Sequence, residues 1–275
     1  MTSSPDPSSS SPDERTEDLR ARLAAVDARI DRATADAGRA DRPHLIVVTK
    51  FFPVEDVLRL AGLGVRDVGE NRDQEAAAKA AAASAVSNSA ASNSAAANSA
   101  ASSDAGDLRW HFIGQLQSNK AKSVVRYARS VQSVDRSSLV RALGRAVADH
   151  RPAELGPLAC WVQVDLDDAA GGDPHSGTTG GRGGAAPADV VSLADAIAAT
   201  DGLTVAGVMA VAPRGADPDA AFARLARIAT DLRAAHPSAD GISAGMSADL
   251  ESAIAHGATH LRVGSDVLGP RPAVG

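Results

Sequence analysis

The segment His44-Leu-Ile-Val-Val-Thr-Lys50 decides the fold class of this chain. Its four consecutive apolar residues, three of them β-branched, are typical of a strand that is buried on both faces of a parallel sheet. A helix is predicted on each side of this strand. Before it, apolar residues recur at helical spacing through Thr16–Ala37, and after it Pro53 stands where the first turn of a helix needs no N–H.

The alternation of strand and helix continues along the chain. Further strands are predicted at Val65–Gly69, Arg109–Gly114, Ser130–Val134, Leu158–Leu166, Leu203–Val211, Gly241–Ala244 and His260–Val263. Helices are predicted between most of them, at Ser118–Ala128, Ser137–Ala148, Asp189–Thr200, Pro218–Ala235 and Ala248–His256. Eight strands separated by helices predict an α/β protein, a single (β/α)8 TIM barrel with an N-terminal helix. An open doubly wound sheet is the alternative, weakened because no GxGxxG motif follows the first strand.

Composition and charge limit the classes of function. The chain has 275 residues, with 28 Lys and Arg against 34 Asp and Glu, and a formal net charge of −6. Proteins that coat nucleic acid or anionic membranes usually present a basic surface, so neither partner is expected. The sequence contains no membrane-spanning apolar run and no secretory signal, and its single cysteine, Cys160, cannot form an internal disulfide. We therefore expect a cytoplasmic protein.

Three segments are too polar or too simple in composition to belong to a packed core. Residues 1–14 are rich in Ser and Pro and are expected to form a disordered tail. Residues 81–106 begin with a long stretch of Ala, Ser and Asn, and residues 171–187 are rich in Gly. Both compositions indicate low-complexity insertions on the surface, and the Gly-rich one lacks the Gly-Lys-Ser/Thr of a P-loop. The rest of residues 15–275 is expected to form one domain.

The candidate site begins with Lys50, which ends the first predicted strand. TIM barrels carry their chemistry at the carboxyl ends of their strands, where this lysine is expected to lie. From its position alone, the amine most simply reaches water. Alternatively, an amine that is partly desolvated in the barrel mouth has a lowered pKa and can form a Schiff base with an aldehyde.

The ends of the last two strands contain small residues suited to holding a phosphate. Ser243-Ala-Gly-Met-Ser247 ends the seventh strand, and Ser247 is expected to cap the following helix. Arg262-Val-Gly-Ser265 ends the eighth, where the N–H groups of Gly264 and Ser265 can approach an anion. TIM barrels commonly hold a phosphate in these two loops. A Schiff-base lysine that faces a phosphate site describes a pocket for pyridoxal 5'-phosphate (PLP).

Six short motifs occur in order over residues 16–271, interrupted only by the two insertions. They are Val48-Thr-Lys50, Gly69-Glu-Asn71, Trp110-His-Phe-Ile-Gly114 with Leu116-Gln-Ser-Asn-Lys120, Ser133-Val-Asp135, Gly245-Met-Ser247 and Arg262-Val-Gly-Ser265. Together they resemble the YggS/PROSC family of PLP-binding proteins. The resemblance implies a single TIM-barrel domain similar to the N-terminal domain of alanine racemase. It also implies a role in vitamin B6 and amino-acid homeostasis, without robust catalysis.

The resemblance further implies which residues bind the cofactor. Lys50 would hold PLP as a Schiff base, and Arg262 would lie beside the pyridine nitrogen. The other six would lie around the phosphate (Ser243, Ser247, Gly264 and Ser265) or elsewhere near the cofactor (Asn71 and Met209). The chain departs from the family at Thr49, where Ser is usual, and at Gln115, where His is usual. The second departure removes a histidine to which a proton transfer could be assigned.

Three functions remain open: a PLP carrier or homeostasis protein, a PLP-dependent amino-acid racemase, and a Schiff-base aldolase acting on a sugar phosphate. A cationic Arg262 at the pyridine nitrogen disfavours its protonation and weakens PLP as an electron sink. A two-base racemase also needs a second base, and the only tyrosine, Tyr127, lies in a predicted helix. We therefore expect a PLP-binding protein with no catalytic residue. No metal is expected, because the pair His256 and His260 implies no acidic third ligand. The expected partners are PLP and PLP-dependent apo-enzymes, with the protein a monomer or weak dimer.

Overall fold

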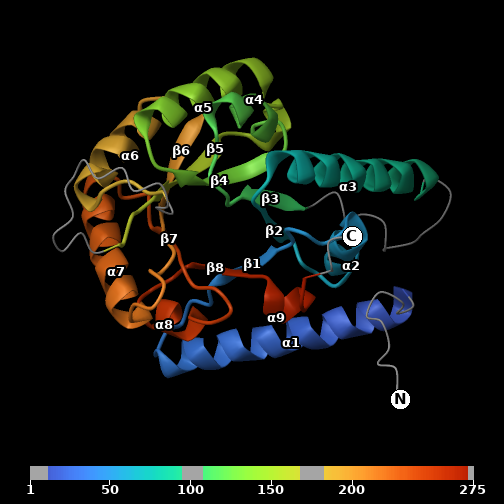
Figure 1. Ribbon diagram of the computed structural model, residues 1–275. Helices are drawn as coiled ribbons and strands as arrows, with labels where there is room; N and C mark the ends of the chain where they lie inside the picture. The colour runs from blue at the N-terminus through green and yellow to red at the C-terminus, as the bar shows by residue number, and fades with distance from the viewer. Residues whose placement is uncertain (1–11, 95–107, 168–182, 272–275) are drawn as a thin grey trace.

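Parallel strands form one closed barrel in the computed structural model, which describes residues 12–94, 108–167 and 183–271. The barrel order is β1 to β8, and β1 closes it by pairing with β8 (Figure 1). The strands are β1 His44–Val48, β2 Asp67–Glu70, β3 Arg109–Phe112, β4 Ala128–Val134, β5 Leu158–Gln163, β6 Leu203–Met209, β7 Gly241–Ser243 and β8 His260–Val263. This closure confirms the predicted TIM barrel and excludes an open doubly wound sheet.

Helices surround the barrel (Figure 1). They are α1 Pro12–Asp36, α2 Val54–Gly62, α3 Asp73–Ser94, α4 Ala121–Val124, α5 Ser137–His150, α6 Val190–Ala198, α7 Pro218–Ala235, α8 Leu250–Ala255 and α9 Ser265–Leu268. The described residues also form the 3₁₀ turns η3 Ser118–Lys120, η4 Ala153–Leu155 and η5 Pro187–Asp189. Most of these elements begin and end within a few residues of the predicted positions, and α7 has the predicted bounds.

The apolar segment that predicted the fold forms β1. Ile46 and Val47 are fully buried, although neighbouring residues of a strand point to opposite faces of the sheet. Val47 pairs with Val68 of β2 on one side and with Val263 of β8 on the other. Burial on both faces and pairing on both edges explain why this strand consists of uninterrupted apolar residues.

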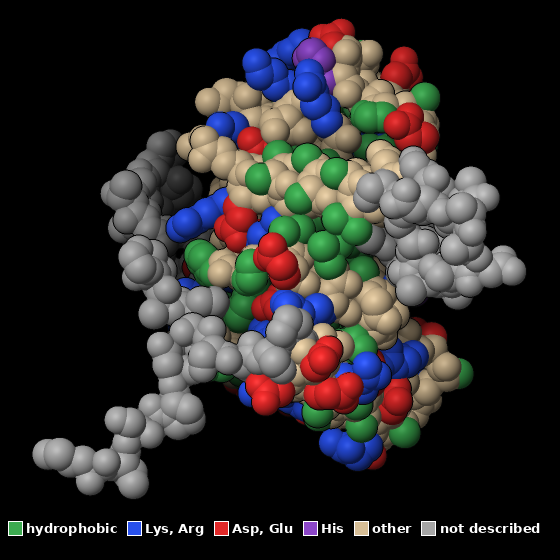
Figure 2. Space-filling view, turned by 90° about the vertical axis from the view of Figure 1, so that its right-hand side faces the viewer, with side chains coloured by type: hydrophobic (Ala, Val, Ile, Leu, Met, Phe, Trp, Pro, Cys, Tyr) green, Lys and Arg blue, Asp and Glu red, His purple; other side chains and the backbone are tan. Residues whose placement is uncertain are grey.

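The N-terminal helix α1 belongs to the same domain as the barrel. It packs beside α8 and α9 at the bottom of Figure 1. Its own residues Leu19 and Ile30 are fully buried. Arg15 also pairs with Asp56 of α2, with 2.8 Å between Nη2 and Oδ2. Acidic and basic side chains are interleaved on the lower part of the molecule in Figure 2. Both apolar packing and ion pairs therefore hold α1 in place.

Two expectations for the low-complexity segments need correction. Helix α1 begins at Pro12, so the predicted disordered tail is wrong for residues 12–14, and residues 1–11 lie outside the described residues. Helix α3 continues into the expected insertion as far as Ser94, and Ala83 within it is only 1% exposed. Alanine has the highest helix propensity, and its methyl group can fill a small space in the core. Residues 95–107, the remainder of that segment, lie outside the described residues.

The second expected insertion, residues 171–187, is described only from residue 183 onward. Its last part returns to the barrel, since Ala185 forms a parallel bridge with Val164 just after β5. The prediction that both segments are surface insertions therefore stays a prediction for their remaining residues.

Three further observations concern the described part of the chain as a whole. None of its helices combines the length and the apolar character that crossing a bilayer requires. Its His, Cys, Asp and Glu side chains nowhere gather in a group of three that could hold a metal ion. Cys160 is fully buried in β5, and this burial raises the pKa of its thiol to about 12.

Candidate cofactor site

The predicted cofactor residues all lie at the carboxyl ends of strands. Lys50 follows β1, Asn71 follows β2, Met209 and Ser243 end β6 and β7, Ser247 lies in the next loop, Arg262 lies in β8, and Gly264 and Ser265 follow β8. Because parallel strands in a closed barrel run in one direction, these residues share one mouth of the barrel. The fold therefore brings together residues that are up to 215 positions apart in the sequence.

Arg262 connects the ends of three strands. Its guanidinium donates to Ser243 Oγ at 2.6 Å and to the backbone carbonyl of Ala210, the residue after β6, at 2.8 Å. Ser243 donates in turn to Gln132 Oε1 of β4 at 2.9 Å. Arg262 is 4% exposed, and burial lowers its pKa to about 10, so it remains a cation at neutral pH. Because both acceptors are neutral, the guanidinium keeps a positive charge that no described carboxylate neutralises by an ion pair.

The loops after β7 and β8 meet at two serines. The hydroxyl of Ser265 donates to Ser247 Oγ at 3.2 Å. The neighbouring Gly264 lies close to the end of β1, since a Cβ at this position would be 3.2 Å from the carbonyl oxygen of Val48. The small residues predicted around the phosphate are therefore adjacent to the strand that carries Lys50.

The predicted capping role of Ser247 is wrong. Helix α8 begins at Leu250, and its N-cap position is occupied by Asp249. The carboxylate of Asp249 instead accepts the backbone N–H of Met246 at 2.6 Å, which fixes the loop. Sequence could not separate these alternatives, because Ser and Asp are both favoured cap residues. The Ser247 hydroxyl is consequently not used by the helix.

The side chain of Lys50 lies beside an aromatic ring and a second cation. Its Nζ is 5.8 Å from the centre of the Phe51 ring, and the guanidinium of Arg271 lies over the same ring at 4.5 Å. Burial lowers the pKa of Lys50, and the positive charge of Arg271 lowers it further, while the negative charge of Glu70 opposes both effects. A larger fraction of the amine is therefore neutral than for an exposed lysine, as attack on an aldehyde requires.

Sequence reasoning missed three side chains around the mouth: Glu75, Lys79 and Gln132. Lys79 is buried, and its Nζ lies 2.7 Å from Oε1 of Glu70 and 2.7 Å from Oε1 of Glu75. Burial raises the pKa of Glu70, against the opposing effect of the bond from Lys79. The spacing of four between Glu75 and Lys79 on a helix was the available signal for this ion pair.

Four buried polar atoms at the mouth lack a hydrogen-bond partner among the described residues. They are Glu70 Oε2, Asn71 Oδ1, Gln132 Nε2 and Ser133 Oγ, all near the carboxyl ends of β2 and β4. An unsatisfied buried polar group costs about 1–3 kcal/mol, so such atoms near the strand ends are candidates to bind a ligand with several polar groups. PLP offers a phosphate, a phenolic oxygen and a pyridine nitrogen, and its negative charge complements Arg262. The residues present therefore fit this cofactor.

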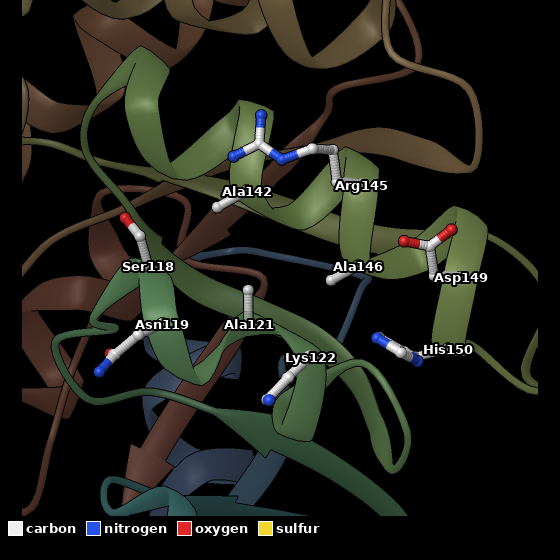
Figure 3. Close-up of a pocket in the computed structure, with 9 residues that line it drawn as sticks. All are labelled: Ser118, Asn119, Ala121, Lys122, Ala142, Arg145, Ala146, Asp149 and His150. Carbon is white, nitrogen blue, oxygen red and sulfur yellow. The ribbon is translucent and has the colours of Figure 1, made fainter.

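A separate hollow lies outside the barrel, between η3–α4 and α5 (Figure 3). It has a volume of about 270 Å³, and Ser118, Lys122, Arg145 and His150 are among the residues around it. None of the eight predicted cofactor residues contributes to it. The candidate cofactor site is accordingly the barrel mouth.

Comparison with known proteins decides the family. Residues 21–272 match the family described as the N-terminal domain of alanine racemase. The chain is 42% identical over 263 residues to the pyridoxal phosphate homeostasis protein of Mycobacterium tuberculosis, covering 94% of this chain and 95% of that protein. This chain belongs to the pyridoxal phosphate homeostasis protein family. The resemblance inferred from the six motifs is thereby confirmed.

Solved structures agree with this family membership. The homeostasis-family chain is similar to PipY of Synechococcus elongatus, whose structure was determined with PLP bound, with a TM-score of 0.69 and 28% identity. That likeness covers 91% of this chain and 100% of PipY. Alanine racemase of Corynebacterium glutamicum has a TM-score of 0.53 and 12% identity, and this chain covers 60% of it. The racemase likeness shows a shared fold alone.

Proposed function

We propose that this protein binds PLP as a Schiff base on Lys50 and serves PLP and amino-acid homeostasis rather than catalysis. One observation carries the proposal: a lysine with a lowered pKa shares the barrel mouth with a buried arginine that forms no ion pair with a described carboxylate and with several unpaired polar atoms. The homeostasis relatives and the PLP-bound structure of PipY support the same cofactor.

Different residues at the mouth would bind different groups of the cofactor. Bound PLP supplies an aldehyde, which a neutral amine attacks to form a C=N bond with loss of one water. Burial and Arg271 keep part of the Lys50 amine neutral, while Arg262 retains its proton and disfavours a second positive charge at the pyridine nitrogen. Ser247, Gly264 and Ser265 would hold the phosphate, with Ser243, Asn71 and Met209 lining the remaining space.

A racemase is less well supported, because Tyr127, the tyrosine considered as its second base, is not suited to that role. Tyr127 lies between α4 and β4 rather than in the predicted helix, and its hydroxyl is 3.5 Å from Asp73 Oδ1. Burial and the negative charge of Asp73 raise the pKa of Tyr127 far above its usual range, so it stays protonated. With L-alanine and PLP, we expect turnover far below the 1–10³ s⁻¹ typical of enzymes.

The covalent link provides the decisive experiment. The protein purified with PLP should absorb in the near-visible region, and borohydride should fix PLP to the peptide that contains Lys50. The Lys50→Ala variant should lose this band, whereas the matched Lys122→Ala variant, altered in the outer hollow of Figure 3, should keep it. Covalent PLP on Lys50→Ala would refute the assignment of this lysine.

We further propose that the partners are PLP-dependent apo-enzymes. Hydrolysis of a Schiff base returns free PLP, so a cytoplasmic monomer or weak dimer could release the cofactor slowly to such enzymes. Mixing the loaded protein with an apo-aminotransferase should restore aminotransferase activity as the near-visible band decays. Sedimentation at several concentrations tests the oligomeric state, and a concentration-independent dimer would contradict it.

A further inference from the structure

Two side chains of α3 hold the peptide groups on both sides of Lys50. On one side, the carbonyl oxygen of Thr49 accepts a hydrogen bond from Lys79 Nζ at 2.9 Å. On the other side, the backbone N–H of Phe51 donates to Glu75 Oε1 at 2.7 Å. Glu75 and Lys79 are one turn apart on α3 and form an ion pair at 2.7 Å. The backbone of the lysine is therefore fixed from α3, while its side chain remains free to enter the mouth.

The turn held in this way is strained. Phe51 has a φ of 72°, the only positive value among the described residues other than glycine. A bulky residue rarely adopts this left-handed conformation unless its surroundings impose it. The bond from the Phe51 N–H to Glu75 supplies such a constraint, directly after the lysine.

Lys79 also forms an ion pair with Glu70, the carboxylate whose charge acts on Lys50. All three of its ammonium donors are used, on Thr49 O, Glu70 Oε1 and Glu75 Oε1. The same oxygen of Glu70 accepts the Thr49 hydroxyl at 2.7 Å. Lys79 and Glu70 are 7% and 1% exposed, so solvent does not screen their charges. Lys79 lowers the pKa of Glu70 against the larger effect of burial, so it helps to keep this carboxyl ionised.

We propose that Lys79 and Glu75 are positioning residues for the PLP-binding lysine, fixing the turn that carries Lys50. This inference rests on the proposed function of Lys50. The charged groups that act on Lys50 are Arg271 and Glu70, beyond the effect of burial. Removing Lys79 raises the pKa of Glu70 further, so this carboxyl becomes neutral and no longer favours the ammonium form of Lys50. Slower binding in a Lys79 variant therefore reports the lost bond to the carbonyl oxygen of Thr49.

The test measures Lys50 both with and without the cofactor. Without PLP, reductive methylation by formaldehyde and cyanoborohydride reports the neutral fraction of each lysine as a function of pH. The chain has four lysines, so mass spectrometry of peptides resolves Lys50 and uses the exposed Lys122 as an internal reference. With PLP, stopped-flow absorbance gives the rate of covalent binding over the same pH range.

The variants separate charge from position. In Lys79→Met, Glu70 should become neutral and the methylation midpoint of Lys50 should fall, whereas covalent binding should slow because the bond to the carbonyl oxygen of Thr49 is lost. In Glu75→Ala, which frees the Phe51 N–H, binding should slow on the order of 10- to 100-fold, because a displaced reacting group loses its alignment. Glu75→Gln keeps an acceptor oxygen for the Phe51 N–H and should restore most of the rate, and Lys122→Met should change nothing.

Each outcome bears on one proposal or the other. Unchanged methylation and binding profiles in folded Glu75→Ala would overturn the positioning role. If Lys79→Met does not fold, the comparison of Glu75→Ala with Glu75→Gln decides the question. A wild-type protein that does not bind PLP refutes the proposed function, while the methylation profiles still decide whether α3 controls Lys50.

Discussion

Replacing Gly114 with alanine tests how the loop after β3 positions Asn71 at the barrel mouth. A Cβ at Gly114 would lie 2.7 Å from Cα and 2.9 Å from the carbonyl carbon of Asn71, and closer still to its carbonyl oxygen. Ordinary van der Waals contacts begin near 3.4 Å. The two segments must therefore separate by roughly 1 Å, and neither can yield by rotating a side chain because all the atoms belong to the backbone.

The expected cost follows from this geometry. Overpacking that shifts backbone typically costs about 1–3 kcal/mol. For a domain of this size, each kcal/mol lowers the melting temperature by about 2–4 °C, so Gly114→Ala should melt roughly 2–12 °C below the wild type. The displacement also moves Asn71, a proposed cofactor residue whose buried Oδ1 has no hydrogen-bond partner among the described residues, so the affinity for PLP should fall as well.

Gly62 provides a matched control. It is the last residue of α2, and a Cβ at this position meets nothing within 4 Å. Because alanine is favoured over glycine in a helix by up to about 1 kcal/mol, Gly62→Ala should melt at or above the wild-type temperature. The two variants carry the same substitution at two sites, and scanning calorimetry should show a lower melting temperature for Gly114→Ala but not for Gly62→Ala. A Gly114→Ala protein that melts with the wild type would refute the close approach of the two loops.

Three further expectations follow from burial. Ala83→Asp should destabilise the protein by several kcal/mol in urea unfolding, because it buries an unpaired charge, whereas Ala81→Asp on the exposed side of α3 should cost little. Cys160 should resist iodoacetamide at pH 8 in the native protein and react after denaturation, since its pKa is raised to about 12; rapid native labelling would contradict its burial. Burial lowers the pKa of His260 to about 4, so between about pH 6.5 and 4 the unfolded chain binds a proton that the folded chain does not. The free energy of unfolding should therefore decrease by up to about 3 kcal/mol as the pH is lowered from about 6.5 to 4. An equal decrease in His260→Asn would show that other groups cause it.

Apolar patterning predicted the strands because each forms part of the barrel wall, where most residues are buried and apolar side chains are therefore required. The prediction failed between residues 118 and 128, where a turn at residues 125–127 separates helix from strand. One helix was expected there, but the structure has the 3₁₀ turn η3 followed by the short helix α4, which ends at Val124. Strand β4 then begins at Ala128, which pairs with Trp110 of β3. A local pattern cannot reveal this boundary, because the pairing with β3 decides it.

In the candidate site, too, local sequence motifs could be recognised, whereas contacts between residues distant in the sequence could not. The positions of Lys50 and Arg262 at the barrel mouth could be predicted because strand ends and short motifs mark them, while their roles toward the cofactor stay a prediction. Lys79 and Gln132 could not, because their roles arise from contacts with Thr49 and Ser243, 30 and 111 positions away. Nothing in the sequence around either residue indicates burial, and the low-complexity stretch that follows Lys79 suggested the opposite.

The two cations of the mouth are held in different ways, and the difference favours binding over catalysis. Arg262 is fixed through its guanidinium by Ser243 and the carbonyl of Ala210, so its charge is permanent and immobile. Lys50 is fixed through its backbone, by the bonds to the peptide groups on either side, which leaves its amine free to form and release a covalent link. At the proposed position beside the pyridine ring, this rigid cation would disfavour the protonated pyridine that carbanion chemistry exploits. The arrangement thus permits reversible attachment of the cofactor while withholding the electron sink that would commit it to a reaction.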